Sequence, residues 1–493
     1  MPPRDRAILV QRKHQELRKI VYYELMEEPL HLELDRAAKT PLAEQIRKGI
    51  STAIETGVLA PGARLPSWLD LAAQLGVARG TVRTAYDKLS AAQLIVASRA
   101  AGTRVADRPP AVPRVDQSPD PGSFMETYLE MTSGPAIFQM GVPAQETFPA
   151  TLLARIRSQA VRAESSAPAI YPDPRGELEL RREIAAYLAV ARGFDCLPSQ
   201  IIITAGYCSG LGLALHVLGL EGRKVWFEDP GLPFARRGLE LARLSLVPVP
   251  VDDDGIDVDH GMRHAPDAAL AVVTPGQQAP LGPVLPLARR LRLLEWAAQE
   301  DSWVIEDDYL SELQLDGRAA PALASLDRAG RVIHIGSFSK TISPALRLGF
   351  VVAPPALLTR FAEVAACLAP PPGPAVQIAT AEFMREGHYL RHLRRTKRVY
   401  AAQRDGVLQS LNVASCTVSV AGLAVLLRLP AGVSDLSIAR DASFFGMAPS
   451  PLSVWFASPA SAPSGLLLGL TTAPQRQLAR SCERLNEIIG RVL

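Results

Sequence analysis

The chain has 493 residues, which is too long for one ordinary hydrophobic core and predicts two or three domains. Hydrophobic residues make up 48% and charged residues 21% of the chain, a globular composition that excludes a largely disordered protein. Every apolar run is far shorter than the about 20 residues that cross a membrane, and no secretory signal opens the chain, so we expect a cytoplasmic protein without a membrane partner. The five cysteines lack metal-ligand spacing, so we expect no metal site.

Residues 1–29 predict a helical extension, because apolar residues recur among charged ones at helical spacing. We expect this helix to pack on the next domain or on a second copy of the chain. Residues 1–108 contain 17 Lys and Arg against 12 Asp and Glu, although the net charge of the whole chain is only +3. This excess favours a polyanionic partner, but a solvated basic face explains it equally well.

Three short helices followed by two strands are predicted within residues 30–106. The helices span residues 41–57, 69–75 and 78–89, and Gly57 and Gly76 end the first two. The stretch LIVASRAAGTRVA supplies two strands joined by a tip of small residues. This order is typical of winged helix-turn-helix domains, which bind double-stranded DNA.

The third of these helices carries the residues best placed to read an operator. Arg79, Thr81 and Arg83 lie near its N-terminus, where a recognition helix presents side chains to base edges and phosphates. The other candidate DNA contacts are Ser67, Arg99, Gly102 and Thr103. The alternative is a three-helix packing module with no role in DNA binding.

Residues 107–130 are expected to form a linker, because residues 107–123 are dense in proline and polar groups and cannot build a core. From residue 131 to residue 493, strands alternate with helical patterns, which predicts an α/β domain with a mostly parallel sheet covered on both faces. The expected strands are residues 200–204, 224–228, 246–250, 269–274, 303–306, 332–335 and 350–353. In such sheets, ligands bind beyond the carboxyl ends of the strands.

A serine-rich loop follows the predicted strand at residues 332–335 and contains Lys340. In RVIHIGSFSKTISPALRLGF, Ser337 precedes this lysine and Arg347 follows it by seven residues. A hydroxyl and a guanidinium suit a phosphate group, which accepts several charge-assisted hydrogen bonds. The alternative is that Lys340 is an ordinary solvated loop lysine.

Two other predicted strand ends carry polar groups. Asp307 closes the strand in WVIEDDYLSEL, and Tyr309 follows two residues later. The strand in QIIITAGYCSGLGLALHVL runs into Gly206, Tyr207 and Cys208 at the start of a helix, which is a ready anion site. Pyridoxal phosphate needs a lysine for a Schiff base, a carboxylate for its ring nitrogen and an anion site, and the three loops together offer all of these. Taken singly, a helix-capping acidic turn or an ordinary glycine turn explains each of the last two motifs.

Several longer motifs resemble known families. LPSWLDLAAQLGVARGTVRTAYDKL resembles the winged helix-turn-helix of GntR-type bacterial regulators, and YPDPRGELELRREIAAYLAVARG, VVTPGQQAPLG and GSFSKTISPALRLGF resemble fold-type I aminotransferases. Both modules in this order resemble the MocR/GabR subfamily of GntR regulators over nearly the whole chain. The resemblance implies a domain of the PLP-dependent transferase fold with a smaller C-terminal α+β lobe, bound pyridoxal 5'-phosphate, and a head-to-tail homodimer.

The chain departs from that subfamily at several expected contact positions. Trp68-Leu69-Asp70 lacks an arginine that relatives use near DNA, and the turn after Gly206 lacks a usual glutamine pair. Leu232 and Ala279 stand where relatives have aromatic residues, and Leu467 stands where aminotransferases have the arginine that binds the substrate carboxylate. Losing such a charged pair removes on the order of 2–5 kcal/mol of binding free energy, so an ordinary α-amino acid is not the expected ligand.

These features predict a DNA-binding transcription regulator, not an enzyme, that holds pyridoxal phosphate on Lys340 and responds to a small-molecule effector. The effector is expected to be an amine or the cofactor itself. Two alternatives stay open. One is a working aminotransferase with an appended DNA-binding module, which Leu467 disfavours. The other is a cofactor-free dimerisation scaffold on a DNA-binding head, which Leu232 and Ala279 favour.

Overall fold

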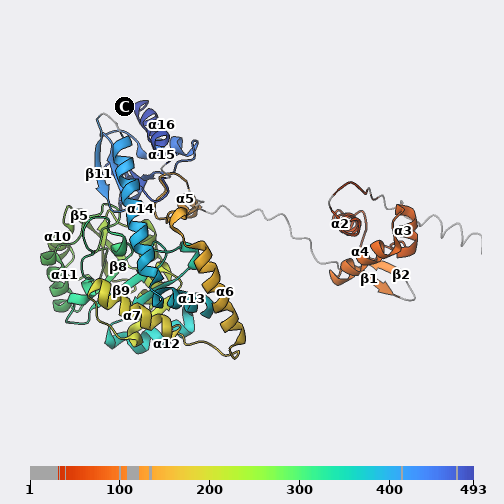
Figure 1. Ribbon diagram of the computed structural model, residues 1–493, viewed down its shortest axis with the longest axis horizontal. Helices are drawn as coiled ribbons and strands as arrows, with labels where there is room; N and C mark the ends of the chain where they lie inside the picture. Colours follow the sequence, from red (N-terminus) through yellow and green to blue (C-terminus); the bar gives the residue numbers. More distant parts are fainter. Residues whose placement is uncertain are drawn as a thin grey trace, which may run out of the picture. The chain divides into compact units, whose positions relative to one another are not determined.

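The computed structural model describes residues 32, 34–38, 40–98, 102–107, 122–132, 136–411, 415–473 and 476–493. The chain divides into two compact units, residues 1–121 and 122–493 (Figure 1). The helical extension predicted for residues 1–29, and Arg99 in the predicted wing, lie outside the described residues. Within the described ranges, no helix combines the length and the hydrophobicity needed to cross a lipid bilayer.

The described part of the smaller unit has three helices and a β-hairpin, in the predicted order. The elements are α2 (Leu42–Glu55), α3 (Trp68–Leu75), α4 (Arg79–Ala91), β1 (Ile95–Ser98) and β2 (Gly102–Val105). α2 and α4 pack on each other through a core in which Ile46, Ile50 and Leu89 are fully buried. Tyr86 lies in the same core, and its hydroxyl donates a hydrogen bond of 2.8 Å to the Pro66 carbonyl oxygen. This contact fixes the segment that leads into α3.

The predicted linker at residues 107–130 is wrong at its C-terminal end, because the structure has a helix, α5, at Gly122–Thr132. The rings of Phe124 and Tyr128 lie 6.1 and 5.2 Å from the ring of Phe234, measured between centroids. Aromatic packing of this kind stabilises a helix that its local composition does not predict. Residues 108–121, the rest of the proline-rich stretch, are not among the described residues.

The larger unit is built on a mixed sheet that has eight strands among the described residues. Their spatial order is β3 (Ile201–Thr204), β10 (Gly349–Val352), β9 (Val332–Ser337), β8 (Trp303–Asp308), β7 (Leu270–Val273), β4 (Lys224–Asp229), β5 (Ser245–Asp252) and β6 (Gly255–Ile256). β10 is antiparallel to both of its neighbours and β6 is antiparallel to β5, while the other neighbouring pairs are parallel. The prediction of a mostly parallel sheet is confirmed, and each predicted strand overlaps an observed one.

Helices cover both faces of this sheet. Helices α8 (Tyr207–Leu218), α9 (Pro233–Leu241) and α12 (Leu358–Leu368) pack on one face, against residues such as Val225, Ile305 and Ile335. The helices on the other face are α6 (Ala150–Ser166), α7 (Leu178–Arg192), α10 (Val258–His264), α11 (Leu287–Gln299) and α13 (Pro374–Arg385). Because side chains alternate along a strand, the position of a residue at a strand end decides which face it reaches.

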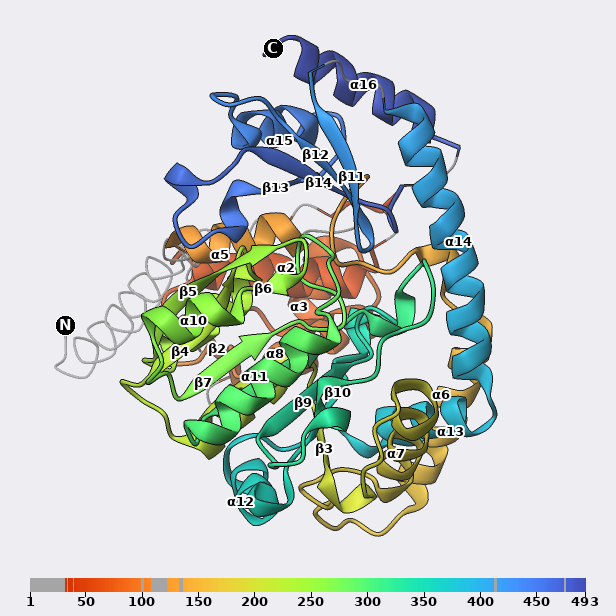
Figure 2. The ribbon, with the colours of Figure 1, turned by 90° about the vertical axis from the view of Figure 1, so that its left-hand side faces the viewer.

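A smaller C-terminal lobe completes the larger unit, as the predicted fold class requires (Figure 2). The long helix α14 (His388–Ser410) runs from the helices beside the sheet to this lobe. The antiparallel strands of the lobe are β11 (Thr417–Ala421), β12 (Ala424–Arg428), β14 (Gly465–Gly469) and β13 (Ser450–Pro451), in that spatial order. One face of this small sheet packs on α15 (Asp435–Ser443) and α16 (Leu478–Gly490), which leaves its other face toward the large sheet.

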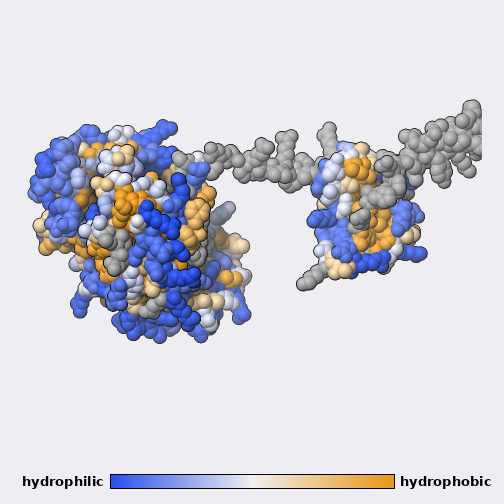
Figure 3. Space-filling model, turned by 90° about the horizontal axis from the view of Figure 1, so that it is seen from above, coloured by the Kyte–Doolittle hydropathy of each residue, from blue (hydrophilic) through white to orange (hydrophobic). Residues whose placement is uncertain are grey.

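Hydrophobic side chains are exposed at several places on the larger unit, among many hydrophilic ones (Figure 3). Ile170 and Tyr171, in the segment before α7, are 78% and 100% exposed. Neighbouring apolar side chains that remain in water are candidates for contact with another molecule.

Gly176 fixes the turn that leads into α7. Its φ of +92° lies in the region that favours glycine, and a Cβ at this position would lie 2.5 Å from Ile203 Cγ1 on β3. We expect Gly176→Ala to lower the free energy of unfolding of the larger unit by at least about 2 kcal/mol, because backbone strain and a steric clash add. Thermal unfolding of the full-length protein measures this loss.

The matched control is Gly317→Ala. Gly317 has a φ of +74°, but a Cβ there would meet nothing within 4 Å, so only the backbone cost of about 1–2 kcal/mol applies. Equal losses in the two variants would contradict the packing assigned to Gly176.

Candidate functional site

The carboxyl ends of β3, β8 and β9 meet at one edge of the large sheet. In the register of the strands, Ser337 pairs with Gly349, and Gly349 pairs in turn with Thr204. Asp307 of β8 pairs with Ile335 of β9. The loops that follow these strands therefore open at the same edge, which is where sheets of this kind bind ligands.

Of the three acids that end β8, Asp307 is the one that faces α8. It follows Ile305 by two residues and shares its face of the sheet, whereas Glu306 and Asp308 lie on the other face. Asp307 is 5% exposed, and burial raises its pKa well above the usual value, as do the negative charges of Asp308 and Glu228. The Lys340 ammonium lowers that pKa, which shows that the two groups lie close enough to interact.

A buried polar network holds the end of β8 from the other face. Asp308 accepts a hydrogen bond of 2.9 Å from Arg192 Nε, and both side chains are buried. Glu306 lies 2.9 Å from His334 Nδ1; burial alone would raise the pKa of Glu306, but His334 holds it well below the usual range. Because a buried charge that loses its partner costs several kcal/mol, this network fixes the strand that presents Asp307.

Lys340 lies in the loop between β9 and β10. Its Nζ donates a hydrogen bond of 2.5 Å to the backbone carbonyl oxygen of Gly141. The loss of hydration lowers its pKa, while the charges of Asp307 and Cys208 act to raise it. A lysine whose pKa is lowered in this way presents a neutral amine more readily, as attack on a carbonyl group requires.

Hydrogen-bond donors gather where the Lys340 loop meets the N-terminus of α8. Ser337 Oγ donates to Ser339 Oγ at 3.0 Å, and a Cβ built on Gly206 would lie 3.9 Å from Ser339 Oγ. No side chain caps the first turn of α8. Burial raises the pKa of the Cys208 thiol, and the Arg347 guanidinium acts to lower it, so Arg347 lies near the start of α8. Backbone N–H groups, hydroxyls and a guanidinium together form a donor set for phosphate.

Two tyrosines approach Asp307. The Tyr207 hydroxyl is buried against the Asp307 carboxylate, and burial together with Asp307 raises its pKa. Tyr309 packs among hydrophobic side chains, and the same two causes raise its pKa. Since Tyr207 directly follows the Gly206 turn, its side chain extends from the donor set toward the carboxylate.

The residues at this edge fit pyridoxal phosphate. The carboxylate suits a protonated ring nitrogen, the donor set suits the phosphate, and the amine suits the aldehyde. The buried Tyr207 hydroxyl lies against the Asp307 carboxylate, so this acid has a polar neighbour on the side of the donor set.

Two residues of this edge, Gly141 and Glu228, were not among the predicted contacts. Glu228 had a usable signal, since it is the acidic residue that ends the predicted strand at residues 224–228. Gly141 had none, because only the folded chain brings its carbonyl oxygen to Lys340.

In the smaller unit, Arg79 and Arg83 are exposed at the start of α4, and Thr81 is half-buried between them. No side chain caps this helix, so its first backbone N–H groups are open to an anion. Ser67 is exposed but serves as the N-cap of α3, where it accepts from the Asp70 backbone N–H and donates to the Asp70 carboxylate. That cap explains the serine without any contact to DNA.

The wing residues Gly102 and Thr103 are half-buried in β2. The exposed side chain of Arg64, from the connection before α3, lies against this hairpin: a Cβ on Gly102 would lie 3.5 Å from Arg64 Nε. Arg64 was not predicted as a DNA contact. It adds a cation beside the wing that only the fold brings there.

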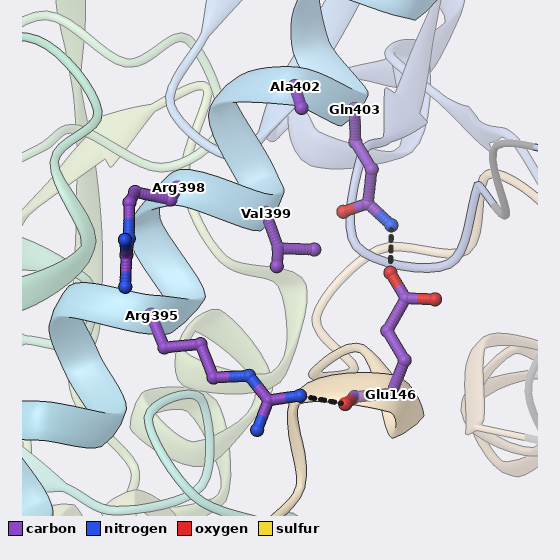
Figure 4. A pocket seen from close by; sticks show the side chains of 6 residues that line it. All are labelled: Glu146, Arg395, Arg398, Val399, Ala402 and Gln403. Atoms are coloured by element: carbon purple, nitrogen blue, oxygen red, sulfur yellow. Dashed lines mark hydrogen bonds between the residues drawn. The ribbon is translucent and has the colours of Figure 1, made fainter.

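A separate cavity of about 400 Å³ lies beside α14 (Figure 4). Its lining residues are Glu146, Arg395, Arg398, Val399, Ala402 and Gln403. Gln403 donates to the Glu146 carboxylate at 3.2 Å, and Arg395 donates to the Glu146 carbonyl oxygen at 3.4 Å. Gln403 Oε1 is buried without a hydrogen-bond partner among the described residues, and none of the lining residues belongs to the Asp307 edge.

Comparison with known proteins matches both units. Residues 42–105 match the family of bacterial regulatory proteins, gntR family, and residues 137–441 match aminotransferase class I and II. The probable rhizopine catabolism regulatory protein MocR of Rhizobium meliloti is 35% identical over 461 residues, covering 89% of this chain and 92% of the relative. The HTH-type pyridoxine biosynthesis transcriptional regulator PdxR of Corynebacterium glutamicum is 33% identical over 377 residues, covering 76% of this chain and 78% of the relative.

The larger unit also matches a solved structure, that of LysN, the α-aminoadipate aminotransferase of Thermus thermophilus, complexed with N-(5'-phosphopyridoxyl)-L-leucine. The match has a TM-score of 0.67 and 27% identity, and covers 76% of this chain and 95% of that chain.

The buried Glu228 carboxyl makes stability depend on pH. It is 4% exposed and accepts hydrogen bonds from Thr274 N and Oγ1, yet burial raises its pKa from 4.5 to about 7. Between these values the folded state binds more protons than the unfolded state, so stability falls as the pH rises through this range. The total loss in the free energy of unfolding, reached when the pH exceeds the pKa of Glu228 in the folded state, is on the order of 3 kcal/mol.

Glu228→Gln removes the titrating group. We expect the stability of this variant, relative to wild type, to rise between about pH 5 and pH 8, measured by urea unfolding at constant ionic strength. Glu179→Gln removes an exposed carboxylate and is the matched control. Parallel pH profiles for wild type and Glu228→Gln would show that the burial argument is wrong.

Proposed function

The chain belongs to the family of GntR-type transcription regulators with an aminotransferase domain, the family of MocR, and on this premise we propose that it holds pyridoxal phosphate on Lys340 and alters its action on DNA in response to a small molecule. It is a DNA-binding transcription regulator. The observation that carries the cofactor proposal is that the buried Asp307, the loop with Lys340 and the N-terminus of α8 open at one edge of the sheet.

Each part of the proposed cofactor has a candidate partner. Asp307 would hold the ring nitrogen, and Tyr309 would hold the phenolic oxygen. The candidate phosphate contacts are Ser337, Ser339, Arg347, Gly206 and the backbone N–H groups of Tyr207 and Cys208 at the start of α8. When bound, pyridoxal phosphate supplies an aldehyde that reacts reversibly with primary amines. The LysN structure, which is a complex with a phosphopyridoxyl compound, supports this assignment.

The effector is proposed to be an amine or the cofactor itself. The relative PdxR is named as a regulator of pyridoxine biosynthesis, which supports the choice of the cofactor as one of the two candidate effectors of this chain. An effector acts on DNA only by binding more tightly to one arrangement of the protein than to another. The effector binds at the Lys340 edge with a different affinity in each arrangement of the protein. The smaller unit then binds the operator with a correspondingly different affinity.

Assembly as a head-to-tail homodimer is part of the proposal. The exposed Ile170 and Tyr171 support a partner subunit, because a contact would remove their apolar surface from water. A dimer presents two copies of α4 to DNA. We therefore expect an operator with repeated half-sites spaced by whole helical turns, roughly 34 Å or a multiple.

Lys340→Ala tests the cofactor. We expect borohydride treatment of wild-type protein incubated with pyridoxal phosphate to fix one cofactor mass to the peptide that contains Lys340, and the variant to gain none. Lys397→Ala, which removes a lysine of α14 away from this edge, is the control and keeps the adduct. Operator binding by Lys340→Ala is expected to lose its response to the cofactor. A variant that still responds would favour the cofactor-free scaffold.

Arg79→Ala and Arg83→Ala test the recognition helix. Each is expected to weaken operator binding by about tenfold, or ~1.4 kcal/mol, and to reduce the slope of log K against log salt by about 1 if the lost contact is to phosphate. Fluorescence anisotropy at several salt concentrations measures both quantities. Lys88→Ala is the matched control, because Lys88 lies on the same helix but pairs with Glu44 at 3.2 Å. Unchanged affinity in both arginine variants would remove the assignment of α4.

A further inference from the structure

An apolar cluster adjoins the Lys340 amine on the side of the C-terminal lobe. Its centre is formed by Leu426, Trp455 and Leu467, each less than 5% exposed. Leu467 belongs to this cluster, while its neighbours on β14, Leu466 and Leu468, belong to the core between the small sheet and α15 and α16. The alternation along β14 therefore turns Leu467 toward the large sheet.

Partly buried residues join this cluster to the proposed cofactor contacts. Met140 precedes Gly141, whose carbonyl oxygen accepts the hydrogen bond from Lys340. Tyr309 follows Asp307 by two residues, and Leu232 precedes α9 at the end of the β4 loop. Their apolar surface is only partly removed from water, so a ligand body that covered it would gain about 25 cal/mol for each Å².

Two polar side chains near the cluster differ in how far their hydrogen bonds are satisfied. Arg236 donates to the carbonyl oxygens of Val454 and Trp455 at 3.1 and 3.2 Å, which ties its guanidinium to the backbone of the lobe. Gln277 is 7% exposed, and its Oε1 has no hydrogen-bond partner among the described residues. A Cβ on Gly422 would lie 3.2 Å from this oxygen, which places the free acceptor beside the turn that follows β11.

A carboxylate placed against this cluster would lose its hydration without gaining a cation, which costs several kcal/mol. We propose that the cluster is the effector subsite and that the effector is a primary amine with an apolar body and no carboxylate, carrying a hydrogen-bond donor for Gln277. The inference rests on the proposed function, because the amine group is taken to react at the Lys340 cofactor.

Three probes that differ by one group each test the subsite. They are phenethylamine, L-phenylalanine, which adds a carboxylate, and tyramine, which adds a hydroxyl. Calorimetry on the full-length protein loaded with pyridoxal phosphate is expected to show phenethylamine binding at least tenfold more tightly than phenylalanine, and tyramine more tightly still. Phenylalanine binding as tightly as phenethylamine, or more tightly, would overturn the proposal.

Two variants separate the contributions. Leu467→Arg is expected to reduce the preference for phenethylamine over phenylalanine at least tenfold, whereas Leu467→Met keeps it. Gln277→Leu is expected to abolish the advantage of tyramine and to keep the preference between the other two probes. If Leu467→Arg does not fold, as its thermal unfolding would show, the wild-type ratio and Gln277→Leu decide the matter.

Cofactor loading is measured separately by mass spectrometry after borohydride treatment. A loaded protein that prefers phenylalanine disproves the subsite and leaves the proposed function standing. A protein that takes up no cofactor disproves the proposed function. In that case the effector subsite is disproved as well, because the amine has no aldehyde to react with.

Discussion

A carboxylate taken out of water and set beside a lysine amine is stable only if the surrounding chain holds both groups in place. In this protein Asp307 is held by a strand whose other face carries the Arg192–Asp308 and His334–Glu306 contacts. Lys340 is held by a loop that closes against the neighbouring strand and by the Gly141 carbonyl oxygen. The order of the sheet brings these supports together, so the candidate cofactor site depends on the register of β8 and β9 more than on any single loop.

What could be predicted from the sequence follows from how local each feature is. The strands were predictable because apolar runs that end in turn residues are a property of short segments. Asp307 was predictable as a strand-end acid. That Asp307, and not Glu306 or Asp308, faces the candidate site depends on which face of the strand α8 covers. Helix α5 was predicted as linker because Phe234, against which its aromatic residues pack, lies more than 100 residues away in the chain. Glu228 and Gly141 reach the site only through the spatial order of the strands.

The two lobes of the larger unit supply opposite kinds of environment. The edge of the large sheet provides charge, with Asp307, Lys340 and Arg347, whereas the C-terminal lobe provides apolar surface through Leu467 and Trp455. Under the proposed function, the groups that would react at the amine and the groups that would select the ligand lie in different parts of the chain. A substitution in the lobe can then change which molecule is accepted without touching the groups that would hold the cofactor.

Ser337, Lys340 and Arg347 belong to one loop between the antiparallel strands β9 and β10. The buried Phe338 anchors it, because its backbone N–H donates to the Leu348 carbonyl oxygen at 3.1 Å. The amine and two of the phosphate donors are therefore parts of one mechanical element and shift together when it shifts. A molecule bound to both the amine and these two donors would therefore be held at two points by a single β-hairpin.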